Sequence, residues 1–162
     1  DVGRAWERAF FDASNEGVRQ VAMRISIVLG EGGGAFPVMR RLTKLGLGGR
    51  QGPGTQWISW LHIDDWVGIA KFLMKNSAIS GPVNLAAPNP VTNQEFMRCM
   101  RKQFAPLGIG FPAPTPAIYL GGVFMGTEPD LVLKSRKVIS RVLAEQKFDF
   151  KFPQIGKALS SF

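Results

Sequence analysis

Gln-Trp-Ile-Ser-Trp-Leu-His-Ile-Asp-Asp, residues 56–65, decides the fold, because it is an apolar run that stops at two adjacent carboxylates. Apolar residues at helical spacing follow directly over residues 66–75, which predicts a strand that ends where a helix begins. Asp64 or Asp65 is suited to cap that helix, since a carboxylate accepts hydrogen bonds from the free N–H groups of the first turn. A general base is the alternative role. We favour the cap, because nothing nearby in the sequence marks either residue as a base.

His62 is the only histidine of the chain and lies between two apolar residues. A buried ring with satisfied hydrogen bonds is the usual interpretation of such a position. Histidine is also the side chain whose unperturbed pKa lies near neutrality, so a role in proton transfer stays open.

Upstream of this stretch, residues 18–29 form an apolar run that predicts one strand buried on both faces, with Arg24 and Ser26 as its polar interruptions. An arginine there needs a partner, either a carboxylate of the core or an anionic group of a ligand. Residues 30–35, Gly-Glu-Gly-Gly-Gly-Ala, match the G-x-G-x-x-A pattern and precede a predicted helix over 36–45. We do not interpret them as a dinucleotide fingerprint. Such a fingerprint needs an acidic residue about 20 positions further on, and a glycine-rich loop occupies that place here.

Further elements are predicted on both sides. A helix covers residues 2–13 and ends near Gly17, and its missing N-cap suggests further chain upstream. A short strand is predicted at 83–86, and the capping box from Thr92 to Glu95 starts a helix over 93–104. Strand, helix and strand in this order indicate an α/β fold. Helices are also predicted from Thr115, over 129–136 and from Ser140, and a final strand over 148–152.

Composition limits the class of protein. A chain of 162 residues with 45% hydrophobic residues fits one globular unit. No apolar run is long enough to span a membrane, and the single cysteine, Cys99, favours a reducing compartment, so we predict a cytoplasmic protein. Cys99 has no neighbours at metal-ligand spacing, and no metal site is predicted. The net charge of +8 fits an anionic partner, but the scattered cations lack interleaved aromatic residues, which argues against nucleic acid.

Several segments together resemble a known family. The most specific block runs from Gly46 to Asp65 and includes Ser59-Trp60-Leu61-His62-Ile63-Asp64-Asp65. Further matching segments are residues 5–7, 24–30, 32–35, 81–84, 87–93, 96, 137–138 and 152–153. In these segments the sequence resembles the YfcH-like branch of the NAD-dependent epimerase/dehydratase proteins, which are extended short-chain dehydrogenases and are also described as SulA-like.

The resemblance implies a fold and a division of the chain. It implies the carboxyl-terminal half of such a protein: an α/β unit made of the last part of a Rossmann-like parallel sheet plus a small, mostly helical substrate lobe. Residues 1–90 would belong to the NAD(P)-binding domain, with a glycine-rich loop insertion at 46–60, and residues 91–162 to the substrate-side lobe. The glycine fingerprint and the tyrosine region of such enzymes would precede Asp1.

The resemblance also implies site residues. Arg24, Val28 and Gly30 would lie on the side of the cofactor, which is NADP or NAD.

Trp57, Trp60 and His62 would lie on the substrate side, although Val28, Trp57 and Trp60 are equally suited to plain packing.

No catalytic residue is assigned. The sole tyrosine, Tyr119, has Val123 instead of lysine four positions on, and no lysine stands beside Trp6 and Glu7, where relatives carry it.

Two functions follow. The first is the substrate-side half of an NAD(P)-dependent oxidoreductase or epimerase-like protein, with a nucleotide sugar as candidate substrate and no nucleic-acid or membrane partner. Alone it would be inactive, and its uncovered apolar face predicts self-association. The second is a non-catalytic basic binding or regulatory module, which the SulA-like description and the missing lysine would allow.

Overall fold

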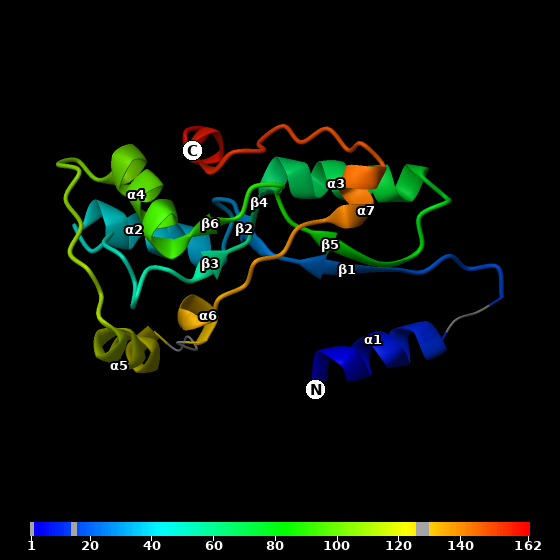
Figure 1. Ribbon diagram of the computed structural model, residues 1–162, viewed down its shortest axis with the longest axis horizontal. Helices are drawn as coiled ribbons and strands as arrows, with labels where there is room; N and C mark the ends of the chain where they lie inside the picture. Colours follow the sequence, from blue (N-terminus) through cyan, green and yellow to red (C-terminus); the bar gives the residue numbers. More distant parts are fainter. Residues whose placement is uncertain (1, 14–15, 126–129) are drawn as a thin grey trace.

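The computed structural model describes residues 2–13, 16–125 and 130–162, and Figure 1 shows their arrangement. The helices are α1 (Val2–Asp12), α2 (Ala35–Lys44), α3 (Ile63–Lys75), α4 (Asn93–Phe104), α5 (Thr115–Met125), α6 (Asp130–Leu133), α7 (Arg141–Glu145) and α8 (Ile155–Leu159). The strands are β1 (Val21–Ile25), β2 (Ile27–Leu29), β3 (Trp57–Ile58), β4 (Trp60–His62), β5 (Gly81–Leu85) and β6 (Val91–Thr92).

Parallel pairing defines the fold class. β1 pairs with β5 in parallel, from Val21 opposite Gly81 to Ile25 opposite Leu85. β2 pairs with β4 in parallel, and α3 connects β4 to β5. Parallel strands need such a crossover connection, because a tight turn can only reverse the chain. The predicted α/β class with part of a parallel sheet is therefore confirmed, and a small antiparallel pair, β3 with β6, joins it to the lobe of α2 and α4.

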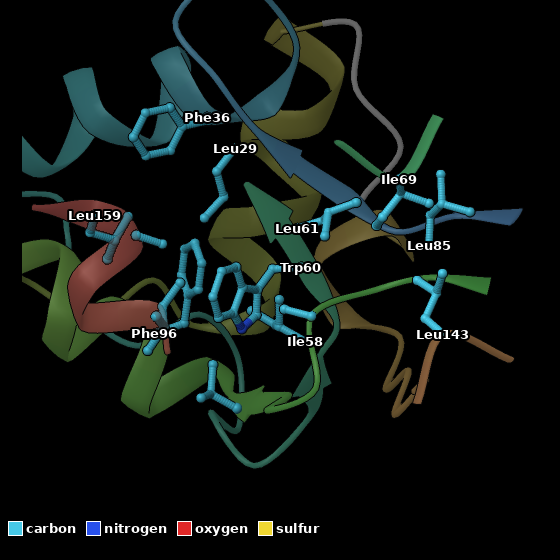
Figure 2. Packing of buried hydrophobic residues seen from close by; sticks show 14 of the residues in the cluster. Leu29, Phe36, Ile58, Trp60, Leu61, Ile69, Leu85, Phe96, Leu143 and Leu159 are labelled. Carbon is cyan, nitrogen blue, oxygen red and sulfur yellow. The ribbon is translucent and has the colours of Figure 1, made fainter. Parts of the chain in front are cut away.

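The stretch at residues 56–65 lies at the centre of the core. Trp60 and Leu61 on β4 are fully buried, and the helix predicted after them is α3. Side chains from α2, α4 and α8 pack on the same cluster, which includes Leu29, Phe36, Phe96 and Leu159 (Figure 2). Burial of so many large apolar side chains is the main favourable term for this unit.

The strand predicted over 18–29 is wrong in two respects. The chain forms two strands that separate at Ser26, whose N–H and hydroxyl both donate to the carbonyl of Leu85 at 3.1 and 2.8 Å. Beyond Ser26 the neighbouring strand changes from β5 to β4. The run is also not buried on both faces, since the side chains of Met23 and Ile25 are exposed by 41% and 52%.

Most predicted helices are confirmed, with corrected ends. The Thr92 hydroxyl accepts from the Glu95 N–H at 3.3 Å at the start of α4, and the Ser140 hydroxyl accepts from the Leu143 N–H at 3.4 Å at the start of α7. α1 ends at Asp12, so Gly17 is not its C-terminal glycine. α6 covers only Asp130–Leu133 of the predicted 129–136, and residue 129 lies outside the described residues.

The predicted final strand over 148–152 is wrong. These residues belong to no ladder, and two of their N–H groups donate to a side chain of α3 instead. Their alternation has another physical cause, since Phe148, Phe150 and Phe152 pack partly buried against the core. Helix α8, which follows, was not predicted.

Within the described parts of the chain, none of the helices combines the length and the apolar character needed to cross a bilayer.

Candidate functional site

Two parallel strands end together at the candidate site. Leu29 ends β2 and His62 ends β4, and the two residues are register partners. The loop at residues 30–34 leaves β2 here, and α3 starts here from β4. Ligands of open α/β sheets bind at the carboxyl ends of the strands, so this edge is the place to look for a site.

The loop at 30–34 leaves the start of α2 open to an anion. Gly34 is the N-cap of α2 and has no side chain to accept from the first turn, which also contains no acidic residue. Gly33 and Gly34 have φ values of 146° and 75°, which side-chain-bearing residues rarely adopt. Glu31 and Arg40 form an ion pair between the loop and the helix. Free N–H groups and the helix dipole suit this terminus to a phosphate or carboxylate.

The predicted cofactor-side residues are not gathered at this loop. Gly30 is at the strand end, and a Cβ there would lie 3.3 Å from the Cβ of Ile63, so the glycine allows close packing against α3. Val28 is half-buried within β2, opposite Leu61. Of the three residues, only Gly30 lies at the candidate site itself.

Arg24 forms an ion pair on the neighbouring strand. Its Nε and Nη2 donate to the two carboxylate oxygens of Glu7 on α1 at 2.5 and 2.6 Å. The hydrogen bond from Arg24 lowers the pKa of Glu7, and the same bond raises the pKa of Arg24. The sequence left two kinds of partner for Arg24, a carboxylate of the protein or an anionic group of a ligand. In the structure the partner is the carboxylate of Glu7.

The predicted substrate-side residues take three different positions. Trp60 is fully buried, and its indole N–H donates to the carbonyl of Asn89 at 3.1 Å. Trp57 is half-buried, with the Lys137 Nζ 3.9 Å from its ring centroid. The structure therefore does not bring Trp57, Trp60 and His62 together around one cavity, and their substrate-side role stays a prediction.

His62 is the N-cap of α3. Its Nδ1 accepts from the Asp64 N–H at 3.0 Å, so the ring proton is on Nε2, which lies 3.0 Å from the Ser161 hydroxyl. Phe152 and Phe162 flank the ring with centroids 3.9 and 4.9 Å away. Burial lowers the pKa of His62. The prediction that Asp64 or Asp65 is the cap is therefore wrong, because His62 is the N-cap and both carboxylates lie within the first turn of α3.

The two carboxylates instead hold the carboxyl-terminal segment. Asp65 is buried, and its two oxygens accept from the N–H groups of Lys151 at 2.8 Å and Phe152 at 3.0 Å. Asp64 is more exposed and pairs with the Lys151 ammonium at 2.7 Å, which lowers the pKa of Asp64. Both carboxylates are thus engaged with residues 151–152.

A buried polar cluster beside the glycine-rich loop was missed from the sequence. Asn93 accepts from the Gln51 N–H at 2.8 Å and donates to its side-chain oxygen at 3.0 Å. Gln56 donates to the carbonyls of Gln51 and Val132 at 2.8 and 3.2 Å. Its own Oε1 is buried without a hydrogen-bond partner among the described residues. An acceptor of this kind suits a donor group of a ligand or a bound water. The sequence signal was that Gln51, Gln56 and Asn93 all lie in segments of the resemblance.

No group of three or more metal-ligating side chains occurs within residues 2–13, 16–125 and 130–162. Cys99 is half-buried and burial raises the pKa of its thiol, so it stays protonated and is a poor nucleophile.

Strand ends, glycine loop and crossover helix define part of an α/β protein with a parallel sheet. Solved structures agree: human epimerase family protein SDR39U1 with NADPH has a TM-score of 0.77 at 32% identity, over 91% of this chain and 49% of that one. A nucleoside-diphosphate sugar epimerase from Corynebacterium glutamicum has a TM-score of 0.73 at 29% identity, over 97% of this chain and 29% of that one.

Sequence comparisons give relatives that share one description. Mycobacterium bovis epimerase family protein Mb2239 is 34% identical over 156 residues, 95% of this chain and 50% of its own length. Human SDR39U1 is 34% identical over 154 residues, 95% of this chain and 51% of its own length. Residues 113–162 match the family described as "Domain of unknown function (DUF1731)". The chain matches the carboxyl-terminal half of these epimerase family proteins and spans about half the length of these curated relatives.

Proposed function

We propose that this chain is the substrate-side half of an NAD(P)-dependent epimerase-like oxidoreductase, with a nucleotide sugar as candidate substrate. The observation that carries the proposal is the likeness, at 32% identity and a TM-score of 0.77, to a human protein whose structure was solved with NADPH. The second neighbour, a nucleoside-diphosphate sugar epimerase, supports the substrate class.

The proposal divides the chain at about residue 90. Residues 1–90 contribute the last parallel strands of the nucleotide-binding unit, and the loop at 46–60 and residues 91–162 form the substrate-side lobe. In this division the open start of α2 after Gly34 receives an anionic group of cofactor or substrate. The unpaired Oε1 of Gln56 receives a donor group from the substrate, because a buried acceptor gains most from such a bond.

Binding measurements test the proposal. NADPH titrated calorimetrically into the 162-residue chain should bind weakly, since the pyrophosphate site of this class lies on a separate strand, glycine turn and helix. Fusing the amino-terminal half of a relative such as human SDR39U1 to the chain should produce tight NADPH binding. Micromolar binding by the chain alone, or no gain from the fusion, would contradict the proposed division.

A second measurement separates an enzyme from a regulatory module. Hydride transfer from bound NADPH is followed by absorbance in the fused protein, with nucleotide sugars as substrates. If Gln56 is a substrate-side residue, Gln56→Leu should lower turnover and leave the affinity for NADPH unaltered. Cofactor binding without turnover on any sugar nucleotide would favour the non-catalytic module.

A further inference from the structure

One end of the molecule carries many more cations than acidic residues. Segments 32–63 and 96–127 contain no Asp or Glu. They carry seven cations: Arg40, Arg41, Lys44, Arg50, Arg98, Arg101 and Lys102. The ring centroids of Phe36 on α2 and Phe104 on α4 lie 6.0 Å apart, so the two helices pack together. The cations on these helices therefore share one end of the fold.

Flanking acids neutralise few of these charges. Arg40 pairs with Glu31, and Arg98 lies 3.6 Å from Glu95. In the described portion of the chain the other five form no ion pair with a carboxylate. Among the described residues, Arg50 and Arg101 donate to the backbone carbonyls of Pro53 and Gly48.

Two loops at this end expose apolar side chains side by side. The Phe111 N–H donates to the Gly46 carbonyl at 2.8 Å, and the Gly49 N–H donates to the Phe111 carbonyl at 3.1 Å. In Figure 1 they lie beside α2 and α4, at the end of the long axis away from α1. The exposed fractions of the apolar side chains on these loops are Leu45 67%, Leu47 52%, Leu107 82%, Ile109 55% and Phe111 67%. We call these five residues the apolar edge.

We propose that the apolar edge and its surrounding cations dock the protein onto a membrane surface of anionic lipids. Exposed aliphatic and aromatic side chains gain free energy by entering the boundary between headgroups and acyl chains. Lysine and arginine beside them are attracted to the lipid phosphates at the same depth. No membrane partner is predicted from the sequence, but folding brings residues 45–47 beside 107–111 and so forms a surface that no continuous stretch of the sequence contains.

Charge and chemistry argue against other occupants. In a two-fold contact each copy uses the same surface. A second copy bound here would therefore place its cations against the cations of the first, and the two would repel each other. Single-stranded nucleic acid binds by stacking bases on aromatic rings, and four of the five residues of the apolar edge are aliphatic. Anionic lipid satisfies both the charge and the aliphatic character.

Cosedimentation with vesicles tests the proposal. The chain should bind vesicles of phosphatidylcholine with phosphatidylglycerol and should leave vesicles of phosphatidylcholine alone in the supernatant. Lys44→Gln with Lys102→Gln should weaken binding by roughly 25-fold, at about fivefold for each cation. Leu107→Asn with Ile109→Asn should weaken it by at least about tenfold.

Matched control variants lie on α3. Met74 is 78% exposed, close to Leu107, and Lys71 and Lys75 are exposed on the same helix. Met74→Asn and the pair Lys71→Gln with Lys75→Gln should leave vesicle binding unchanged, and circular dichroism should show every variant folded like the parent chain. Failure to bind phosphatidylglycerol vesicles overturns the proposal. So do equal losses in the α3 controls, or binding of a single-stranded oligonucleotide in preference to vesicles.

Discussion

At the scale of single residues, His62 joins an end of a strand to the start of a helix. Its Nδ1 takes the place of the usual oxygen of an N-cap, and its ring lies between Phe152 and Phe162. The neutral ring is the form that caps, since protonation removes the acceptor at Nδ1. Stability and the protonation of this ring are therefore linked.

We predict that the chain loses stability as the pH falls from 7 to 5. Burial lowers the pKa of His62 in the folded chain below its usual 6.5. Below pH 6.5 the unfolded chain therefore binds a proton at His62 more readily than the folded chain does. The contribution of His62 to the free energy of unfolding is fully present above about pH 6.5 and declines below it, by at most about 1.4 kcal/mol per pH unit. Urea unfolding at several pH values measures the slope.

His62→Asn is the control for this effect. Asparagine caps helices well, so the start of α3 should survive. Loss of the ring contacts should cost about 2 kcal/mol at pH 7, and the slope between pH 7 and 5 should flatten. Asp64 does not confuse the result, because Lys151 lowers its pKa below 3.8 and its contribution is lost only in more acidic solution. An unchanged slope in the variant would show that another group titrates.

We predict that Asp65→Asn is costly although asparagine is nearly the same size. Both carboxylate oxygens of Asp65 accept backbone N–H groups, and the asparagine NH₂ would face one of those donors. A buried donor left without an acceptor costs about 1–3 kcal/mol. Asp64→Asn, which breaks an exposed ion pair with Lys151, should cost less than about 1 kcal/mol. Equal urea midpoints for the two variants would argue against this role of Asp65.

At the scale of elements, the glycine-rich loop owes its path to close backbone contact. A Cβ at Gly49 would lie 2.3 Å from the Phe111 carbonyl oxygen and 2.4 Å from the Pro112 nitrogen. We predict that Gly49→Ala separates the loops at 46–52 and 111–113 and lowers the free energy of unfolding by about 2–3 kcal/mol. Gly32→Ala, where no atom lies within 4 Å, is the matched control and should stay within about 0.5 kcal/mol in the same urea titration.

At the scale of the whole molecule, the face of α1 and β1 is apolar and open. Trp6 is 73% exposed on α1, and Met23 and Ile25 are exposed on β1. In the described part of the chain β1 pairs only with β5, which leaves its other edge unpaired. Sedimentation velocity should therefore show self-association that rises with concentration.

Charged residues on this face should suppress the association. Met23→Lys with Ile25→Lys places like charges at the contact, whereas Met74→Lys on α3 should leave the association constant unchanged. A monomer at all concentrations, with a sharp two-state urea transition, would contradict the prediction.

Local patterns in the sequence were enough for α2, α3, α4 and β5, because helical periodicity and capping residues act within a few positions of the chain. The same patterns failed where contact with a distant segment of the chain determines the local structure. Ser26 divides a continuous apolar run because β5 pairs on one side of it and β4 on the other. The alternation at 148–152 resembled a strand, yet those N–H groups bond to Asp65, which is 86 and 87 positions away from its two partners.

The candidate site shows the same division. From sequence alone came the α/β class, the family resemblance, the glycine loop after a strand and the buried character of the stretch at 56–65. Tertiary structure alone decided that Arg24 pairs with Glu7, that His62 caps α3 and that Asp65 holds the carboxyl-terminal segment. The physical reason is that apolar periodicity records how much of each residue is buried. The partner of a polar side chain depends on which distant backbone or carboxylate the fold brings within hydrogen-bonding distance.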